Sequence, residues 1–373
     1  MKKSQYLLIS AVFVVVFFYG LSVGVYNIFP YELLDSSNDA LFGQKTIENN
    51  QFVNQADMDS LIKIDNKSDI DQKRNFLTEF FWNVESLQSL KDKLQLPEVE
   101  SDISDSRYNN FQNLLRIDRL TVEMEYGINS VSYLFIPEQS NEKLILYHQG
   151  HGGDFILGKN TIQFFLDRNF TVLASTMPLV GMNNQPVVEI DGLGKMKLIS
   201  HDQLSLLETN YFNPMRLFLD PIQINLNFLD KEYDFKQYSM IGISGGGWTT
   251  VVYSAIDERI SDSFSVAGSM PFYLRVNDRD IGDYEQTNID LYEVTNYLEL
   301  YVLSAYGEKK HIQIFNKNDP CCFSGNGYET YEFVIKDKIS QLGKGNFQIF
   351  IDDTHNEHKI SDTALEHIAK NIG

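Results

Sequence analysis

The sequence predicts an α/β fold in which a mostly parallel sheet has helices on both faces. From about residue 117, short β-rich runs alternate with helical segments, the pattern of parallel strands joined by crossover helices. The chain has 373 residues, 43% of them hydrophobic, which is enough for one large core and a modest extension. We therefore expect one large domain over residues 117–373.

Eight strands are expected in this domain. The first two, 119–125 and 130–136, alternate in hydrophobicity and are joined across Gly127, so they predict an antiparallel hairpin at the sheet edge. The other six strands are expected at 143–147, 171–175, 238–243, 261–266, 311–315 and 347–351. Helices are expected between and after them, near 158–168, 215–230, 246–256, 329–342 and 362–372.

The segment 271–307 interrupts this alternation. It is acidic and rich in tyrosine, and it is an insertion that predicts either a lid over a site or a packed helical excursion.

The N-terminus predicts a membrane anchor. Two lysines, Lys2 and Lys3, precede a stretch from Tyr6 to Phe29 that is long and apolar enough to cross about 30 Å of hydrocarbon as a helix. A cleaved signal peptide, assigned to the same 1–30 region, is the alternative. Because no further lysine follows until Lys45, the positive-inside rule predicts a single-pass protein with its large domain on the exoplasmic face, periplasmic or extracellular.

Residues 31–116 are polar and predict a linker followed by a helical extension. Apolar residues at helical spacing occur only in patches, such as Phe76, Phe80 and Val84, so one or two helices are expected there.

Charge and cysteine content exclude several classes of function. There are 51 acidic and 31 basic residues, and the net charge of −20 repels phosphate backbones, so no nucleic-acid partner is expected. The two cysteines, Cys321 and Cys322, are neighbours and cannot close a long loop. We interpret them as two small half-buried side chains beside a loop, with no zinc site to complete.

The strongest motif is Gly-Ile-Ser-Gly-Gly at 242–246, between a hydrophobic strand and a helical run. Small residues allow a sharp, strained turn on which a serine hydroxyl projects, which is the arrangement of a nucleophile. The helix that follows directs its N-terminal dipole towards a developing negative oxygen. Ser244 is therefore the predicted nucleophile.

A second glycine-rich loop, His-Gln-Gly-His-Gly-Gly at 148–153, follows the strand at 143–147. Such a loop exposes backbone N–H groups, and one of them, paired with the N–H of Gly245, predicts an oxyanion hole. Gly150 and His151 are the first candidates for the donor, followed by Gly152 and Gly153. His148 and His151 lack a third ligand in sequence, so neither a metal nor a cofactor is expected.

An acid and a base are expected after later strands. Asp319 follows the strand at 311–315 and is suited to accept an imidazole N–H. Two histidines, His355 and His358, follow the last strand. We favour His358 as the base because it precedes Ser361, a suitable N-cap for the final helix, and keep His355 as the alternative.

In these motifs, and in the chain order Ser244, Asp319, His358, the sequence resembles the α/β-hydrolase superfamily over about residues 117–373. The resemblance implies an eight-stranded α/β-hydrolase fold and a serine hydrolase that cleaves a carboxylic ester or related acyl bond of a small-molecule substrate without a cofactor. Peptidases and thioesterases also belong to this superfamily. Two alternatives remain: a catalytically silent, membrane-anchored binding protein, and an acyltransferase with the same triad. The oligomeric state is not indicated.

Overall fold

The computed structural model describes residues 16, 17, 19, 58–90, 96–275 and 281–373. The chain divides into two units, Met1–Gln51 and Phe52–Gly373, and the elements described below belong to the second. Of the predicted anchor, all but Val16, Phe17 and Tyr19 lies outside the described residues. None of the described helices is long and apolar enough to cross a membrane. The anchor therefore stays a prediction without support from the structure.

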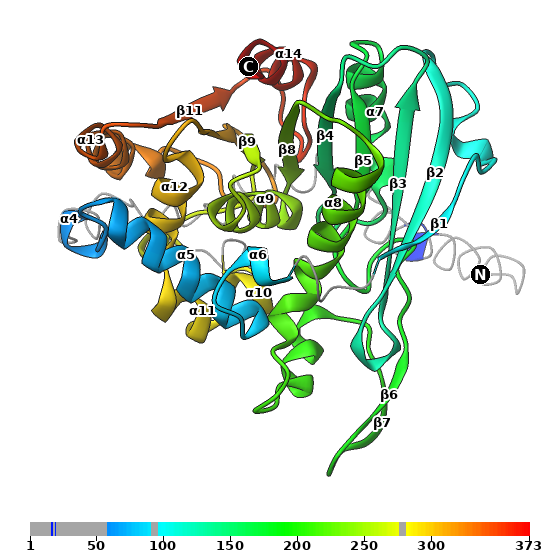
Figure 1. Cartoon of the computed structure of the whole chain (residues 1–373), viewed down its shortest axis with the longest axis horizontal. Helices are drawn as coiled ribbons and strands as arrows, with labels where there is room; N and C mark the ends of the chain where they lie inside the picture. Colours follow the sequence, from blue (N-terminus) through cyan, green and yellow to red (C-terminus); the bar gives the residue numbers. More distant parts are fainter. Residues whose placement is uncertain (1–15, 18, 20–57, 91–95, 276–280) are drawn as a thin grey trace, which may run out of the picture. The chain divides into compact units, whose positions relative to one another are not determined.

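A nine-stranded sheet forms the centre of this unit (Figure 1), in the order β1-β2-β3-β5-β4-β8-β9-β10-β11. The pairs from β1 to β5 along this order are antiparallel, and all pairs from β5 to β11 are parallel. The strands are β1 (Glu98–Glu100), β2 (Leu114–Glu123), β3 (Asn129–Pro137), β4 (Lys143–His148), β5 (Thr171–Ser175), β8 (Gln237–Ile243), β9 (Ile260–Val266), β10 (Lys310–Asn316) and β11 (Asn346–Asp352).

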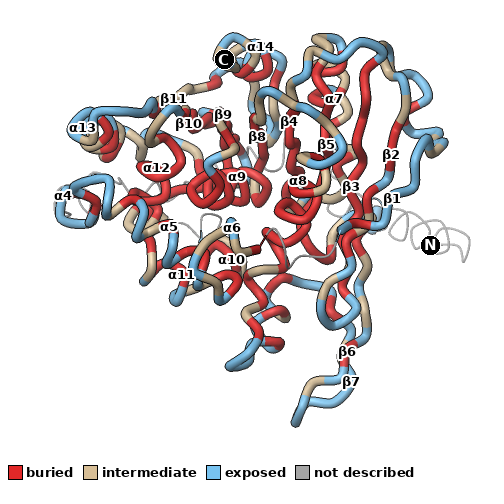
Figure 2. Tube along the Cα trace, viewed as in Figure 1, coloured by how far each residue is buried: buried red, intermediate tan, exposed pale blue. Residues whose placement is uncertain are grey.

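Both faces of the sheet are buried, because successive strand residues belong to different hydrophobic clusters. In β4, Leu144 and Leu146 belong to one cluster, whereas Ile145 and Tyr147 belong to the other. Figure 2 shows the resulting buried centre, in which strands β4, β5 and β8 and helix α9 are red along most of their length. Burial on both faces explains why these strands are continuous hydrophobic runs.

Helices cover the two faces. The first cluster contains residues of α5 (Lys67–Trp82), α8 (Asp220–Glu232), α9 (Gly245–Ile256), α12 (Tyr297–Ala305) and α13 (Glu332–Leu342). The second contains residues of α7 (Lys159–Leu166) and α14 (Asp362–Asn371). The shorter helices are α4 (Met58–Leu61), α6 (Leu87–Leu90), α10 (Tyr284–Thr287) and α11 (Ile289–Val294).

All eight predicted strands and all five predicted helices are present, with bounds shifted by a few residues. Among the strands of the described residues, two features were not predicted. The short strand β1 pairs outside β2, so the hairpin β2–β3 lies one strand in from the edge. A separate hairpin, β6 (Val187–Ile190) with β7 (Gly194–Lys197), forms its own two-stranded sheet.

The segment before β2 packs into the same unit as the sheet. Helix α5 begins with a capping box in which Asn66 accepts from the backbone N–H of Asp69 and the Asp69 side chain accepts from that of Asn66. Its apolar face is buried in the first cluster through Leu77 and Phe81, whereas Phe76 points outward. The predicted helical extension is therefore present and contributes to the core.

The described part of the inserted segment contains three α-helices, which differ in how far they are buried. In α12 every residue is buried, so this part of the insertion belongs to the core. Helices α10 and α11 are partly exposed. A lid role stays a prediction for the part before α12.

Candidate active site

Ser244 lies on the turn between β8 and α9, as predicted. Its backbone has φ 58° and ψ −128°, a strained conformation for a residue with a side chain. Residues 241–243 and 245–250 are all buried, and Ser244 alone among 241–250 is partly exposed. The turn therefore presents this one side chain at the end of a buried strand, which is the geometry of a nucleophile elbow.

Glycine is required on both sides of Ser244 because other backbone segments lie against the turn. A Cβ at Gly242 would stand 2.0 Å from the carbonyl oxygen of Gly246, and one at Gly246 would stand 2.1 Å from that of His148. Neither position has room for a side chain. The glycine-rich motif is thus a packing requirement of the elbow.

The loop after β4 lies directly beside Ser244. A Cβ at Gly150 would be 2.5 Å from Ser244 Cβ and 3.0 Å from the backbone nitrogen of Gly245. Gly245 is the first residue of α9, where a backbone N–H has no partner within the helix. Among the described residues, no hydrogen bond uses the backbone N–H of Gly150 or His151. The loop therefore brings unpaired N–H groups close to the predicted nucleophile.

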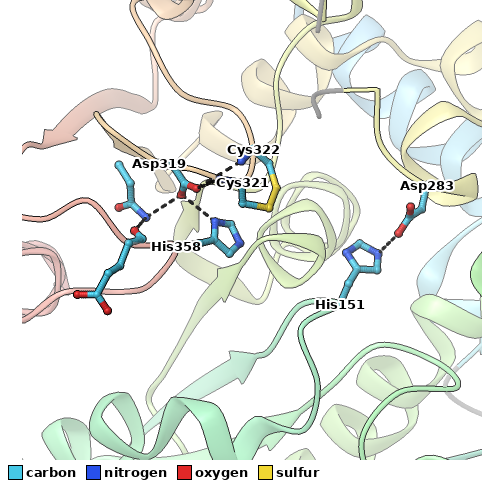
Figure 3. Close-up of a disulfide and its surroundings, with 8 residues drawn as sticks. His151, Asp283, Asp319, Cys321, Cys322 and His358 are labelled. Atoms are coloured by element: carbon cyan, nitrogen blue, oxygen red, sulfur yellow. Dashed lines mark hydrogen bonds and ion pairs between the residues drawn. A yellow bond between two sulfur atoms is a disulfide. The ribbon is translucent and has the colours of Figure 1, made fainter. Parts of the chain in front are cut away.

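Asp319 follows β10 and its carboxylate is held by four donors. Oδ1 accepts from the backbone N–H of Cys321 at 2.8 Å and of Cys322 at 3.3 Å. Oδ2 accepts from Asn316 Nδ2 at 3.2 Å and lies 2.7 Å from Nδ1 of His358 (Figure 3). The side chain of Asp319 is fully buried. This surrounding fixes the carboxylate in one orientation towards His358.

The charge state of Asp319 follows from these contacts. Burial raises the pKa of the carboxyl, but the hydrogen bond and the charge of His358, with the Cys321 N–H, outweigh burial and hold the pKa below its usual value. Asp319 is therefore an anion at neutral pH and a stable acceptor for an imidazole N–H.

His358 has one ring nitrogen on Asp319 and the other without a partner. Nε2 is buried and makes no hydrogen bond among the described residues, Ser244 included. With Nδ1–H donated to Asp319, Nε2 carries the lone pair that a general base needs. Catalytic hydrogen bonds are often long before substrate binds, so the missing bond to Ser244 does not exclude that role.

The alternative base, His355, has other partners. Its Nε2 lies 3.3 Å from Asp352 Oδ2, and its Nδ1 accepts from the backbone N–H of Glu357. Asp352 in turn accepts from Thr354 and Ser361, and Ser361 caps α14 as predicted. His355 and Asp352 thus fix the loop that carries His358. Asp353, the residue after Asp352, is exposed.

Topology brings the predicted nucleophile, acid and base to one edge of the sheet. Strands β8, β9, β10 and β11 are consecutive and parallel, and Ile243 pairs with Val266, which pairs with Ile314, which pairs with Phe350. Ser244, Asp319 and His358 all follow the carboxyl ends of these strands. Because neighbouring strands are about 4.8 Å apart, β8 and β10 are separated by roughly 10 Å, a gap of the size that an imidazole between Asp319 and Ser244 bridges.

Cys321 and Cys322 form a disulfide with each other, which the sequence did not predict, and Cys321 is exposed where a half-buried side chain was expected. The turn directs both of their backbone N–H groups onto Asp319. Their sulfur atoms and a ring nitrogen of His358 all lie within 4.8 Å of one another (Figure 3). As expected, the bond closes no long loop.

A second polar cluster, which the sequence did not indicate, surrounds His151. Its Nε2 lies 2.8 Å from Glu285 Oε1 and 2.9 Å from Asp283 Oδ2, and His201 contacts the same Glu285. Burial lowers the pKa of His151, but hydrogen bonds with the two carboxylates outweigh burial and raise the pKa to about 10. His148 is not part of this cluster, and burial lowers its pKa to about 4.

Comparison with known proteins identifies the fold. No family model and no curated protein sequence matches the chain. The acetyl xylan esterase from Paenibacillus sp. R4 superposes with a TM-score of 0.56 at 13% identity, over 84% of this chain and 97% of that one. Acetyl xylan esterase 1 from Thermoanaerobacterium sp. JW/SL YS485 gives 0.52 at 16% identity, over 84% and 95%. The chain therefore has the predicted α/β-hydrolase fold.

Proposed function

We propose that this chain is a serine hydrolase that cleaves carboxylic esters through an acyl-enzyme, with Ser244, His358 and Asp319 as its triad. The observation that carries the proposal is the strained, partly exposed Ser244, which lies against the backbone of Gly150 at the sheet edge that also bears the Asp319–His358 pair. An α/β-hydrolase fold alone does not define an activity, so the proposal depends on these side chains.

In the first half of the reaction, His358 Nε2 takes the proton of Ser244 Oγ while Oγ bonds to the acyl carbon and the carbonyl electron pair moves to oxygen. Collapse of this intermediate breaks the bond to the alkoxy oxygen, which leaves as the alcohol with the proton from His358. Water then loses a proton to His358 and attacks the acyl carbon. The acid departs and Ser244 regains its proton.

The developing oxyanion would accept from the N–H of Gly245 and from an N–H of the loop at Gly150 or His151. A single donor of this kind contributes on the order of 10²–10³ in kcat. Asp319 would hold the Nδ1–H tautomer of His358 and stabilise the imidazolium as it forms.

The test is a series of p-nitrophenyl esters of increasing acyl length with the full chain. The series begins at acetyl because two of the structural neighbours are acetyl xylan esterases. Ser244→Ala should lower kcat/KM by at least about 10⁴-fold with an unchanged circular dichroism spectrum. Ser106→Ala, at an exposed serine outside the proposed triad, is the matched control and should keep full activity. Undiminished turnover in Ser244→Ala would refute the proposal.

We also propose that the chain is anchored by residues 6–29 with its hydrolase domain on the exoplasmic face. The lysines before this apolar stretch support that orientation, and so does the Cys321–Cys322 bond, since disulfides persist in oxidising compartments. The chain should stay with membranes in alkaline carbonate and be digested by protease added outside spheroplasts or intact cells. Release by carbonate, or full protection from protease, would contradict this placement.

A further inference from the structure

Four metal-ligating side chains from three separate segments converge beside the loop after β4. They are His151 of that loop, His201 of the segment 201–207, and Asp283 and Glu285 of the inserted segment. One ligand atom from each lies within 4.8 Å of the ligand atoms of the other three. Figure 3 shows that His151 and Asp283 face one another, apart from the Asp319–His358 pair.

The hydrogen bonds of His201 leave one ring nitrogen facing a carboxylate. His201 Nε2 lies 2.9 Å from the backbone oxygen of Pro178, which can only accept, so Nε2 carries a hydrogen. In the neutral ring Nδ1 then has a lone pair, and it lies 3.1 Å from Glu285 Oε2, which is also an acceptor. A histidine that binds a metal commonly donates its other N–H to a backbone carbonyl in this way.

His151 also has a ring nitrogen that cannot satisfy the carboxylate acceptors around it. Its Nε2 lies within hydrogen-bond distance of two carboxylate oxygens, one of Asp283 and one of Glu285. A ring nitrogen carries at most one hydrogen and cannot satisfy both oxygens with a well-directed bond. A cation among these four groups would satisfy every acceptor at once.

We propose that His151, His201, Asp283 and Glu285 bind one divalent metal ion of the zinc type. Two imidazoles and two carboxylates are ligands that Zn²⁺ takes in tetrahedral sites. With metal–ligand bonds of about 2.0–2.2 Å, the ligand atoms of such a site are roughly 3.4 Å apart. In this cluster the hydrogen-bonded ligand atoms are 2.8–3.1 Å apart, and all four ligand atoms lie within 4.8 Å of one another. The spacing of a zinc site falls between these distances.

Charge and burial agree with a divalent cation. The side chains of Glu285 and His201 are 0% and 4% exposed. The metal ion would displace the proton that His151 otherwise holds, and two carboxylates with two neutral imidazoles then carry a charge of −2. The two positive charges of the ion would neutralise the two carboxylates. Without a counter-charge, burying these carboxylates would cost free energy of folding. His151 and Asp283 are 27% and 48% exposed, which leaves the ion a path from solvent.

The surroundings hold the ligands in place. The Tyr292 hydroxyl donates to the backbone oxygen of Glu285 at 3.1 Å and accepts from Trp248 Nε1 on α9 at 2.8 Å. Arg275 donates to the backbone oxygens of Ile281 and Gln286 on either side of the two carboxylates. The ion would thus fasten the inserted segment to the loop of His151, whose ring lies against Gly245.

The test is metal uptake by the full chain, measured by elemental analysis and by titration calorimetry with ZnCl₂ after chelation. The wild type should take up about one Zn²⁺ per chain, and Co²⁺ in its place should give the visible absorption of a tetrahedral complex. Glu285→Gln should abolish uptake. Asp283→Asn, at a side chain that is 48% exposed, should weaken affinity at least tenfold.

Asp290→Asn, at an exposed aspartate of the same segment, and His367→Gln, on α14, are the matched controls and should bind as the wild type does. Ser244→Ala should also bind normally, so this result is independent of the hydrolase proposal. Absence of uptake by the wild type, or uptake by Asp283→Asn and Glu285→Gln equal to that of the wild type, would overturn the metal site and leave a proton as the shared cation.

Discussion

Gly150 lies where the loop after β4 meets the nucleophile turn. A Cβ there would stand 2.5 Å from Ser244 Cβ and 2.6 Å from the carbonyl oxygen of Ile243, so Gly150→Ala must displace the loop or the turn. We expect kcat/KM for a p-nitrophenyl ester to fall by at least about 10²-fold, because the oxyanion donors lose their alignment.

Gly152→Ala is the control for this change. Gly152 is in the same loop, and the nearest atom to its added Cβ would be 3.9 Å away, on Leu157. This variant keeps its N–H and should retain activity within about threefold. Equal losses in the two variants would mean that the loop tolerates no substitution and that contact with Ser244 is not the cause.

Asp319→Asn tests the acid. The amide would turn an N–H towards His358 Nδ1, which leaves the hydrogen on Nε2 and removes the lone pair that accepts the serine proton. We expect kcat to fall by on the order of 10³–10⁴-fold, measured with the same esters. Asp353→Asn, on the exposed neighbouring loop, should have little effect. Nearly full activity in Asp319→Asn would assign the acid to another residue.

The sequence predicted those candidate site residues that belong to local motifs. Ser244 and Asp319 follow strands in the expected order, and His358 was favoured over His355 from the cap at Ser361, which the structure contains. The cluster around His151, which includes His201, was not predicted. Its members are far apart in sequence and share no local pattern, so only the tertiary fold brings them together.

Helix α5 lies in the segment 31–116, where the sequence predicted helices but did not indicate how they pack. Phe81 is 1% exposed in the core, whereas Phe76 on the same helix is 44% exposed. Phe81→Ala should lower the free energy of unfolding by about 3–5 kcal/mol, and Phe76→Ala by less than about 1 kcal/mol, in denaturant unfolding. Similar values for both would mean that α5 does not pack as an integral part of the core.

The elements that were predicted are long and buried on a clear pattern, as in β4, β8 and α9. Those that were missed are short. Strand β1 has three residues, all exposed, and hairpin β6–β7 is mostly exposed, so neither has the alternation of a half-buried strand. Helix α12 was assigned to an insertion because it is buried along its whole length and so lacks an exposed polar face.

The stability of the whole molecule should depend on pH through Lys309. Its ammonium is buried against the backbone oxygens of Ser254 and Asp257 at the end of α9. Burial, with the nearby charge of Arg74, lowers its pKa to about 7. Between pH 7 and about 10.5 the unfolded chain therefore binds more protons at this residue than the folded chain, so its contribution to stability rises with pH.

Lys309→Met removes the titrating amine and with it this pH-dependent contribution to the free energy of unfolding. The difference in unfolding free energy, wild type minus variant, should increase with pH from 7 to 10, with a slope of up to about 1.4 kcal/mol per pH unit. Guanidinium unfolding at several pH values measures it. A difference that stays constant or falls over this range would show that Lys309 keeps its ordinary pKa in the folded chain.

The central claim, a nucleophilic serine activated at the edge of this sheet, is tested most directly by covalent labelling of the full chain. A fluorophosphonate should add one adduct per chain, which peptide mass spectrometry should locate at Ser244 and which Ser244→Ala should lose. An unlabelled wild-type chain, or an adduct on another residue, would contradict the account.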